Sequence, residues 1–221
     1  MEHASVKAYK GIGMEGMIAK WYAANTRKGL AEFRALARRV AGQLAPGGKV
    51  LELAPGPGYF AIELAKISSY QITGLDISKS FVEIARRNAG GEKVPVDFRQ
   101  GDAAHTPFAD ESFDFLLCRA AFKNFSEPLQ AIREMWRILK KGGRAVIIDL
   151  RRDASQKDIN ELVDRMGMSW GSRIFTKLTF RFMLLKRAYT RSEFERLVSQ
   201  TEFHQAMIDE TPTGLEITLQ K

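Results

Sequence analysis

The chain has 221 residues, of which 45% are apolar and 27% are charged, with only 18 glycines, 7 prolines and one cysteine. This composition allows one well-packed domain and excludes a disulfide framework. The formal net charge of +8 favours anionic partners without choosing among them. No apolar run approaches the roughly 20 residues that cross a bilayer, and the first residues do not read as a secretory signal. We therefore expect a cytoplasmic protein.

Bulky side chains are concentrated before the first predicted strand, in residues 1–47, which we expect to form a helical cap. A buried phenol near a ligand needs a partner for its hydroxyl group, which makes Tyr9 and Tyr22 candidate functional residues. Packing of a helix onto the sheet explains Trp21 at least as well.

Residues 50–62 read VLELAPGPGYFAI, an apolar run followed by two glycines and a new apolar periodicity. This pattern predicts a buried strand near 49–54 that turns sharply into a helix near 59–67. Gly56 and Gly58 let the backbone approach a ligand, and the helix directs its free N–H groups toward it. The spacing also fits a dinucleotide fingerprint, and a tight turn without a ligand is a further alternative.

Two later strands lead into carboxylates, with Asp76 ending the strand at 71–76 and Asp102 following the strand at 96–100. Ligands bind outside the carboxyl ends of parallel strands, so both carboxylates should converge on the glycine turn. A carboxylate at Asp76 can accept from two ribose hydroxyls, and Asp102 can accept from an adenine amino group. The alternatives are capping of the helix near Ser78 for Asp76 and a solvated turn for Asp102.

The alternation of strands and helices predicts an α/β fold with a doubly wound, mainly parallel sheet. Its further strands are expected near 113–119 and 144–150, and its further helices near 79–89 and 127–140.

The helix at 127–140 should be capped by Ser126 and end at Gly142-Gly143. Near the end of the chain, Thr190 and Glu193 form a capping box that opens the last helix. Segments 204–209 and 214–220 should then close the sheet as a hairpin-like pair.

Five motifs occur in order between about residues 48 and 150: VLELAPGPG, GLDIS, GDAAHTPF, SFDFLLC and ILKKGGR. Together they resemble the class I S-adenosylmethionine-dependent methyltransferases, of the small-molecule type related to the ubiquinone-biosynthesis enzymes. The resemblance implies S-adenosylmethionine as cofactor and a Rossmann-like seven-stranded sheet with an antiparallel closing strand. The single cysteine, Cys118, cannot form a metal cluster, and we expect no metal site. The cofactor-binding residues that it implies are Glu52, Ala54, Gly56, Gly58, Asp76, Ile77, Asp102, Ala103 and Arg119.

The resemblance also gives these residues roles. Glu52 and the two glycines would shape the pocket for the methionine portion, and Asp76 would hold the ribose. Asp102 with the Ala103 backbone would bind the adenine, and Arg119 falls where the backbone receives the methionine amino group.

We expect a single methyltransferase domain over residues 1–221. Its parts would be the N-terminal helical cap 1–47, the cofactor-binding core 48–150, a lid inserted at 151–189, and a closing helix and strands at 190–221.

From Arg165 to Arg191 there are seven basic residues and no acidic one. At helical spacing, two side-chain sets occupy different faces: the basic Arg173, Lys177 and Arg181, and the apolar Phe175, Leu178, Phe182 and Leu185. This pattern predicts a lid whose apolar face covers the pocket while its charges are solvated. Attraction of an anionic acceptor and contact with an acidic membrane surface or nucleic acid are alternatives.

Methyl transfer from a sulfonium is an in-line displacement, so the protein acts mainly by positioning and by excluding water. Related enzymes often carry a histidine after the fourth strand, but this chain has Phe122-Lys123-Asn124-Phe125. Tyr9, Tyr22 and Asn124 are therefore the candidate catalytic residues.

We expect a small-molecule methyl acceptor and no nucleic acid, because the Asn/Asp-Pro-Pro-aromatic motif of amino-group methylation is missing. The alternative is a noncatalytic adenosyl-ligand-binding protein that docks on membrane or RNA through the basic lid. The oligomeric state stays open.

Overall fold

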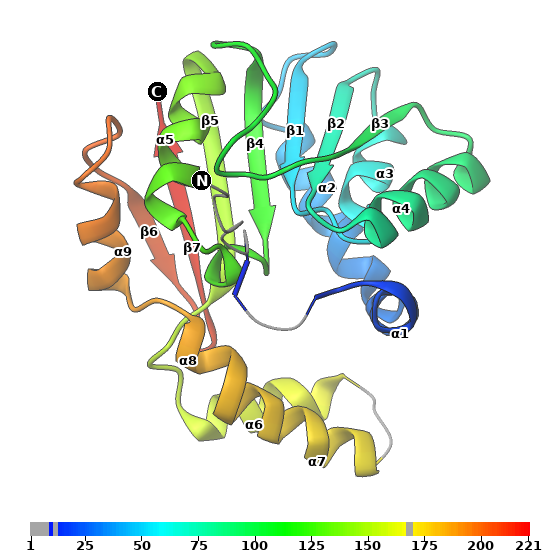
Figure 1. Cartoon of the computed structure of the whole chain (residues 1–221), viewed down its shortest axis with the longest axis vertical. Helices are drawn as coiled ribbons and strands as arrows, with labels where there is room; N and C mark the ends of the chain where they lie inside the picture. Colours follow the sequence, from blue (N-terminus) through cyan, green and yellow to red (C-terminus); the bar gives the residue numbers. More distant parts are fainter. Residues whose placement is uncertain (1–8, 11–12, 167–169) are drawn as a thin grey trace, which may run out of the picture.

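The computed structural model describes residues 9–10, 13–166 and 170–221 (Figure 1). Residues 1–8 and 11–12 of the predicted cap and 167–169 of the predicted lid lie outside the described residues. Within the described ranges, no helix combines the length and apolar character that crossing a membrane requires.

A seven-stranded sheet in the order β3-β2-β1-β4-β5-β7-β6 forms the centre of the protein (Figure 1). The strands β1 to β5 pair in parallel, and β7 lies antiparallel between β5 and β6. This confirms the predicted mainly parallel sheet with its antiparallel closing strand. The strands are β1 (Lys49–Leu53), β2 (Gln71–Asp76), β3 (Val96–Gln100), β4 (Phe113–Arg119), β5 (Leu139–Leu150), β6 (Met207–Glu210) and β7 (Gly214–Gln220).

Helices cover both faces of the sheet, with α2, α3 and α4 packed on one face and α5 and α9 on the other. The helices are α1 (Gly16–Thr26), η1 (Arg27–Gly29), α2 (Leu30–Ala41), α3 (Tyr59–Ala65), α4 (Lys79–Glu92), η2 (Phe122–Asn124), α5 (Pro128–Ile138), α6 (Gln156–Arg165), α7 (Trp170–Thr179), η3 (Phe180–Leu184), α8 (Leu185–Arg187) and α9 (Arg191–Val198).

The central strands contain apolar runs because helices cover both faces of the sheet. In β1, Val50 packs into the cluster with α2, α3 and α4, while Leu51 and Leu53 pack into the cluster with α5 and α9. Successive side chains of a strand point to opposite faces, so a strand covered on both sides is apolar throughout. Cys118 of β4 belongs to this core, and its burial raises the pKa of its thiol.

The boundary between α5 and β5 differs from the prediction. Leu139 has an extended backbone (φ −72°, ψ 138°) and pairs with Phe113 of β4, so α5 ends before the predicted glycines. The N-cap of α5 is Glu127, without a side-chain cap bond, so the predicted capping by Ser126 is wrong. The capping box at the start of α9 is confirmed.

Helices α6, α7 and α8, together with η3, form an arm that extends beyond the carboxyl ends of the parallel strands (Figure 1). In this arm the π-helix η3 turns Phe180 inward, and Phe180 packs with Ile159 and Val163 of α6. Phe175 and Phe182 are instead exposed. The prediction that the apolar face covers a pocket is therefore wrong for these side chains.

Two of the basic residues of the predicted lid are ion-paired while remaining partly exposed to solvent. Lys177 Nζ lies 2.9 Å from a carboxylate oxygen of Asp164 on α6, and the Arg173 guanidinium lies 3.6 Å from the same carboxylate. These ion pairs link α7 to α6.

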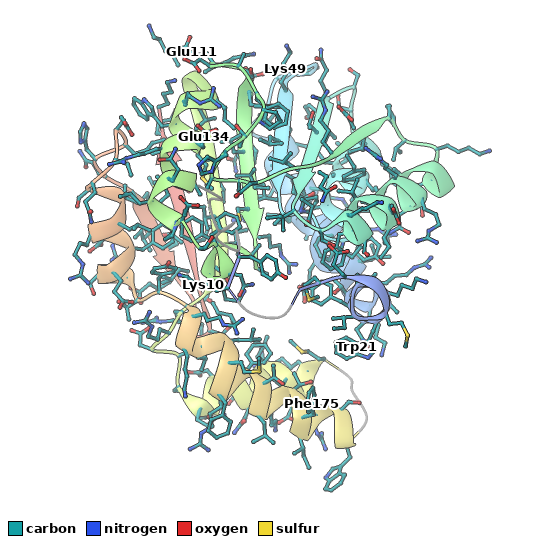
Figure 2. The ribbon with its side chains drawn as sticks, viewed as in Figure 1. Lys10, Trp21, Lys49, Glu111, Glu134 and Phe175 are labelled. Carbon is teal, nitrogen blue, oxygen red and sulfur yellow. The ribbon has the colours of Figure 1, made fainter. Side chains whose placement is uncertain are left out.

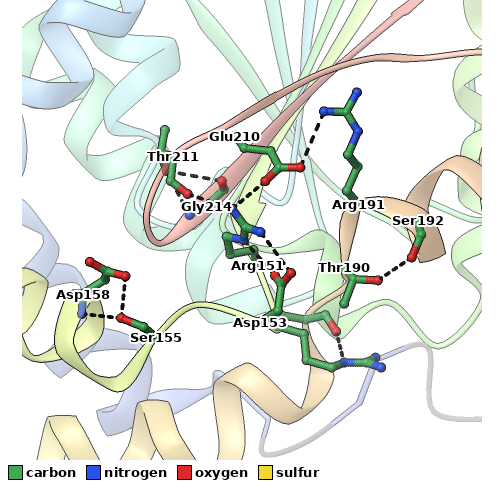
Figure 3. A network of polar contacts seen from close by, with 12 residues as sticks. Arg151, Asp153, Ser155, Asp158, Thr190, Arg191, Ser192, Glu210, Thr211 and Gly214 are labelled. Atoms are coloured by element: carbon green, nitrogen blue, oxygen red, sulfur yellow. Dashed lines mark hydrogen bonds and ion pairs between the residues drawn. The ribbon is translucent and has the colours of Figure 1, made fainter.

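The arm leaves and rejoins the sheet at one network of charged residues (Figure 3). The Arg151 guanidinium lies 2.7 Å from Asp153 and 2.6 Å from Glu210 at the end of β6. Arg191, at the start of α9, approaches the same Glu210 at 3.5 Å. Arg151 also pairs with Tyr189 in an isolated parallel bridge, so both ends of the arm are fixed at one point.

Candidate functional site

The loop between β1 and α3 adopts three left-handed conformations in five residues. Gly56 and Gly58 have φ of 54° and 78°, and Ala54 has φ of 53° although it carries a Cβ. Non-glycine residues in this region are strained, and such strain is found mainly where the surrounding structure fixes a functional turn. The Ala54 N–H donates to the Leu75 carbonyl oxygen at 2.8 Å, which fixes the turn against the end of β2.

The two glycines of this loop meet different surroundings. A Cβ at Gly58 would lie 2.6 Å from the Phe98 ring and 3.0 Å from Ala85, so Gly58 is required for packing. A Cβ at Gly56 would find only Tyr22, at 4.0 Å. The space beside Gly56 is therefore open, and the ligand contact predicted for the two glycines stays a prediction.

Asp76, the last residue of β2, is buried and tied to the glycine loop. One carboxylate oxygen accepts from the Gly56 N–H at 2.9 Å, and the other accepts from the Ser78 N–H at 2.9 Å. Desolvation raises its pKa to about 6, against the lowering effect of these bonds. Ser78 is itself the N-cap of α4, so the alternative role of Asp76 as the cap residue is wrong.

Glu52 is the next-to-last residue of β1, just before the same loop. Its carboxylate accepts from the Ala61 N–H in the first turn of α3 at 3.2 Å. Burial raises its pKa to about 8, while the Ala61 bond and the charge of Arg119 act in the opposite direction. Burial therefore favours the protonated carboxyl group, and a further positive charge nearby would favour its ionised form.

Asp102 and Ala103 follow β3 in a tight turn. The Asp102 carboxylate accepts from the Ala104 N–H at 2.9 Å, and Asp102 forms an isolated bridge with His105. Asp102, Ala103 and Ile77 are half-buried. The Gln100 side chain donates to the Ile77 carbonyl oxygen at 3.2 Å, which links the ends of β2 and β3.

The Arg119 side chain at the end of β4 points toward α2. Its guanidinium donates to Glu32 at 3.0 Å and lies over the Phe33 ring at 4.5 Å. The residue after it, Ala120, has φ of 59°, a second non-glycine left-handed residue directly after a parallel strand. The Arg119 side chain is thus occupied by contacts with Glu32 and Phe33. Only the Arg119 backbone remains for the predicted contact with the methionine amino group.

Helix α1 packs against the glycine loop and the start of α4. The Tyr59 hydroxyl donates to the Ala23 carbonyl oxygen at 2.9 Å, and the Ser78 hydroxyl donates to the Met14 carbonyl oxygen at 2.6 Å. Tyr22 of α1 contacts the Phe81 ring edge-on at 5.6 Å. These contacts bring Tyr22 to the same loop as Gly56.

Tyr9 and Asn124 form a second group. Tyr9 pairs with Phe125 in an antiparallel bridge, and the Lys10 N–H donates to the Asn124 carbonyl oxygen at 2.6 Å. The Asn124 side-chain oxygen is buried without a hydrogen-bond partner in the described part of the chain. A buried acceptor without a partner is costly unless a ligand or water supplies a donor.

A buried ion pair beside Asn124 was not predicted. Lys123 Nζ lies 2.8 Å from Asp149 at the end of β5, and it also donates to the Ala120 carbonyl oxygen at 2.6 Å. Asp149 accepts from the Lys123 and Leu150 N–H groups as well. The sequence shows a lysine within an apolar stretch and a carboxylate near the end of an apolar strand, but not that the two side chains pair.

A cavity of about 410 Å³ lies at the other end of the sheet. None of the predicted site residues lines it; its walls are Asp110, Glu111, Gln130, Arg133, Glu134, Trp136, Arg137, Glu202 and Lys221.

Comparison with known proteins gives consistent matches. The family model described as a methyltransferase domain matches residues 51–147. The chain is 39% identical over 108 residues to a demethylmenaquinone methyltransferase of Deinococcus radiodurans, a match covering 48% of this chain and 45% of that protein. It is 31% identical over 176 residues to the demethylmenaquinone methyltransferase of Chlorobaculum parvum, covering 76% of this chain and 70% of that protein.

Among solved structures, a putative S-adenosylmethionine-dependent methyltransferase of Methanococcus maripaludis superposes with a TM-score of 0.77 at 22% identity. That match covers 96% of this chain and 95% of the other chain, and it shows a shared fold.

The chain belongs to the class I S-adenosylmethionine-dependent methyltransferases. Within that class it is related to the ubiquinone and menaquinone biosynthesis methyltransferases. The cofactor of this family is S-adenosylmethionine. The match spans about half the length of several of the curated relatives, 45% for the Deinococcus protein and 46% for a Geotalea daltonii protein.

The residues at the ends of β1 and β2 fit this cofactor. The space beside Gly56 accommodates a ligand without a Cβ in the way. The Asp76 oxygens accept from the Gly56 and Ser78 N–H groups, and because a carboxylate oxygen can accept more than one hydrogen bond, this arrangement is compatible with a ribose hydroxyl as a further donor. Glu52 lies below as a carboxyl group that a cationic ligand would ionise.

Proposed function

We propose that the protein transfers a methyl group from S-adenosylmethionine to a small-molecule acceptor. The observation that carries this proposal is the direct hydrogen bond between the Gly56 N–H and Asp76, beside the open space at Gly56. One carboxylate thereby orients both the loop and a ribose. The relationship to the Chlorobaculum parvum enzyme supports the same conclusion.

Within this proposal each group of residues has a task. Asp76 holds the ribose, Glu52 and the loop residues Ala54, Gly56 and Gly58 surround the methionine portion, and Arg119 contributes its backbone. Ile77, Asp102 and Ala103 bound the adenine. Helix α1 with Tyr22 excludes water, which protects a reactive sulfonium.

The chemistry needs little covalent participation by the protein. When bound, S-adenosylmethionine supplies an electrophilic methyl group on a sulfonium. The chain's part is to hold the acceptor in line with the methyl–sulfur bond, because orientation accounts for up to about 7–11 kcal/mol in well-placed intramolecular reactions. We assign this positioning to Tyr9 and Asn124, since the Asn124 side-chain oxygen is buried without a partner.

For the acceptor, we propose a quinol-type aromatic ring. Support comes from the named activity of the relatives, which are demethylmenaquinone methyltransferases. The pairing of Arg173 and Lys177 with Asp164 argues against an anion site there. Turnover should therefore vary little with salt, whereas a steep loss of efficiency would support the predicted anionic acceptor.

The test is transfer of isotope-labelled methyl groups from S-adenosylmethionine to a reduced naphthoquinone. Asn124→Ala should lower turnover while leaving S-adenosylmethionine affinity unchanged, and Asn160→Ala, a change on α6 where the side chain contacts Gln156, serves as the matched control. Cofactor binding without transfer to any acceptor in a cell extract would instead indicate the noncatalytic alternative, which the comparisons do not favour.

A further inference from the structure

Helix α7 and the following η3 expose an unusual number of large apolar side chains. Trp170 is 72% exposed, Phe175 66% and Phe182 52%, and Ile174, Leu178 and Met183 are also exposed. Isolated exposed apolar residues are ordinary, but a contiguous group of this kind marks an interaction surface. These six residues are called the arm stripe below.

The arm stripe follows one side of the helix. Trp170, Ile174, Leu178 and Phe182 are spaced four residues apart, which places them in a line along a helix surface. The inward side is already used, because Phe180 packs against α6 and Lys177 pairs with Asp164. The arm stripe is therefore not what attaches α7 to the protein.

The charges within the segment that carries the arm stripe are of one sign, although Asp164 of α6 pairs with Arg173 and Lys177 on its inward side. Between Arg165 and Arg191 the chain has seven basic residues and no acidic one. Arg181 is exposed, with its guanidinium 5.3 Å from the Phe182 ring centroid, and Lys186 is exposed one turn further on. Aromatic side chains bordered by cations are the pattern of helices that lie in the interface of an anionic bilayer.

A second exposed apolar group lies at the same end of the molecule. Met17 is 84% exposed and Trp21 61% exposed on α1, with the exposed Lys20 between them. Figure 2 shows Trp21 and Phe175 at the end of the molecule opposite Lys49 and Glu111. The carboxyl ends of the parallel strands lie at this end of the molecule, including the end of β2, whose last residue is Asp76 (Figure 1).

We propose that the arm stripe and its bordering cations dock this protein on an anionic lipid surface, with α1 as a second contact. The inference goes beyond methyl transfer and does not require that the acceptor be a lipid. The aromatic residues insert at the headgroup level, and Arg181 and Lys186 contact the lipid phosphates. Docking in this way turns the carboxyl end of the sheet toward the membrane.

The test is flotation of the full chain with phosphatidylcholine vesicles that contain or lack phosphatidylglycerol. Binding should need the anionic lipid and weaken as salt rises, because surface charge attraction is screened. Phe175→Ser with Phe182→Ser, and separately Arg181→Gln with Lys186→Gln, should each lower the fraction bound about tenfold or more. These side chains are exposed, so the variants should melt like the unmodified protein.

Matched controls lie on other surfaces. Met207→Ser removes an apolar side chain that is 68% exposed on β6. Lys93→Gln with Lys141→Gln removes two exposed cations away from the arm. Neither control should change vesicle binding.

Three results would overturn the proposal: no flotation with anionic vesicles, binding that survives both arm variants, or equal loss in the controls. Sedimentation velocity of the protein without lipid is a further test. A concentration-dependent dimer that disappears in the Phe175→Ser and Phe182→Ser variant would assign the surface to a second copy of the chain.

Discussion

At the scale of single residues, Asp76 is the side chain that tests the proposed cofactor site most directly. Asp76→Asn replaces one carboxylate oxygen by an NH₂ group, which then faces a backbone N–H of Gly56 or Ser78. We expect S-adenosylmethionine affinity to fall by about 1.5–3 kcal/mol, the range for a hydrogen bond to a charged group. Calorimetry measures this loss. Asp97→Asn, at an exposed position of β3, should leave the affinity unchanged, and an unchanged affinity in Asp76→Asn would remove the ribose role.

Glu52 makes a prediction about pH. Burial raises its pKa from 4.5 to about 8, so the folded protein holds a proton that the unfolded chain has lost. The free energy of unfolding that this group contributes is full below about pH 4.5 and is lost as pH rises toward about 8. The pKa of Asp76 is raised from 3.8 to about 6, so Asp76 adds a further loss of unfolding free energy as pH rises between these values.

Urea unfolding between pH 4.5 and 8.5 measures this dependence in the cofactor-free protein. Glu52→Gln should flatten the decline in stability, because the amide does not ionise, whereas Glu83→Gln on exposed α4 surface should leave it unchanged. A decline that persists unaltered in Glu52→Gln would contradict the assignment.

Several of these residues could be predicted from the sequence, and others could not. The pattern of strand followed by acidic residue located Asp76 and Asp102, because the carboxyl ends of parallel strands meet at one edge. The pairing of Lys123 with Asp149, 26 residues apart, depends on the relative position of η2 and β5. No local pattern in the sequence carries that information.

At the scale of elements, the glycine loop separates packing from ligand contact. Both Gly56→Ala and Gly58→Ala place a Cβ at positive φ, which costs about 1–2 kcal/mol. Gly58→Ala also drives that Cβ into Phe98, adding about 1–3 kcal/mol of overpacking. We therefore expect Gly58→Ala to be the less stable variant in urea unfolding.

When the two variants are compared in their folded states, Gly56→Ala should lose more S-adenosylmethionine affinity than Gly58→Ala. Gly56→Ala, which keeps more of the fold, should lose S-adenosylmethionine binding because its Cβ occupies the open space beside the loop. Full binding by Gly56→Ala would mean that the ligand approaches from elsewhere.

The connection between η2 and β5 can be tested through its buried ion pair. Lys123→Met leaves Asp149 buried without a cation, which should cost about 3–5 kcal/mol of unfolding free energy. Adding Asp149→Asn should recover part of this loss. Arg99→Met, in the exposed pair with Asp97, should cost less than about 1 kcal/mol. Equal effects of Lys123→Met and Arg99→Met would show that the buried pair is not structurally important.

Element boundaries were predicted well where apolar runs are bounded by turn residues, as in β1, β2 and β4. The end of α5 was misplaced because Leu139 continues the apolar helical period, yet it pairs with Phe113 of β4. Tertiary pairing decided between two locally acceptable conformations.

At the scale of the whole molecule, the alternation of strands and helices predicts the mainly parallel sheet, and the family resemblance predicts its seven strands with an antiparallel closing strand. The orientation of the arm does not follow in the same way. The sequence between 170 and 187 shows an apolar and a basic side, but periodicity does not say which side faces the protein. Asp164 on α6 and the π-helix at Phe180 decide it. The carboxyl ends of the parallel strands, where we propose the cofactor site, are therefore flanked by α1 and by the arm (Figure 1). The large apolar side chains of α7 and η3 in the arm face outward.

The central claim, that the ends of β1 and β2 bind S-adenosylmethionine, is tested most directly by titration calorimetry of the full chain. S-adenosylmethionine and its demethylated product should both bind, NAD should give no heat of binding, and Gly56→Ala should weaken both adenosyl ligands. Binding of NAD without binding of S-adenosylmethionine would contradict the account.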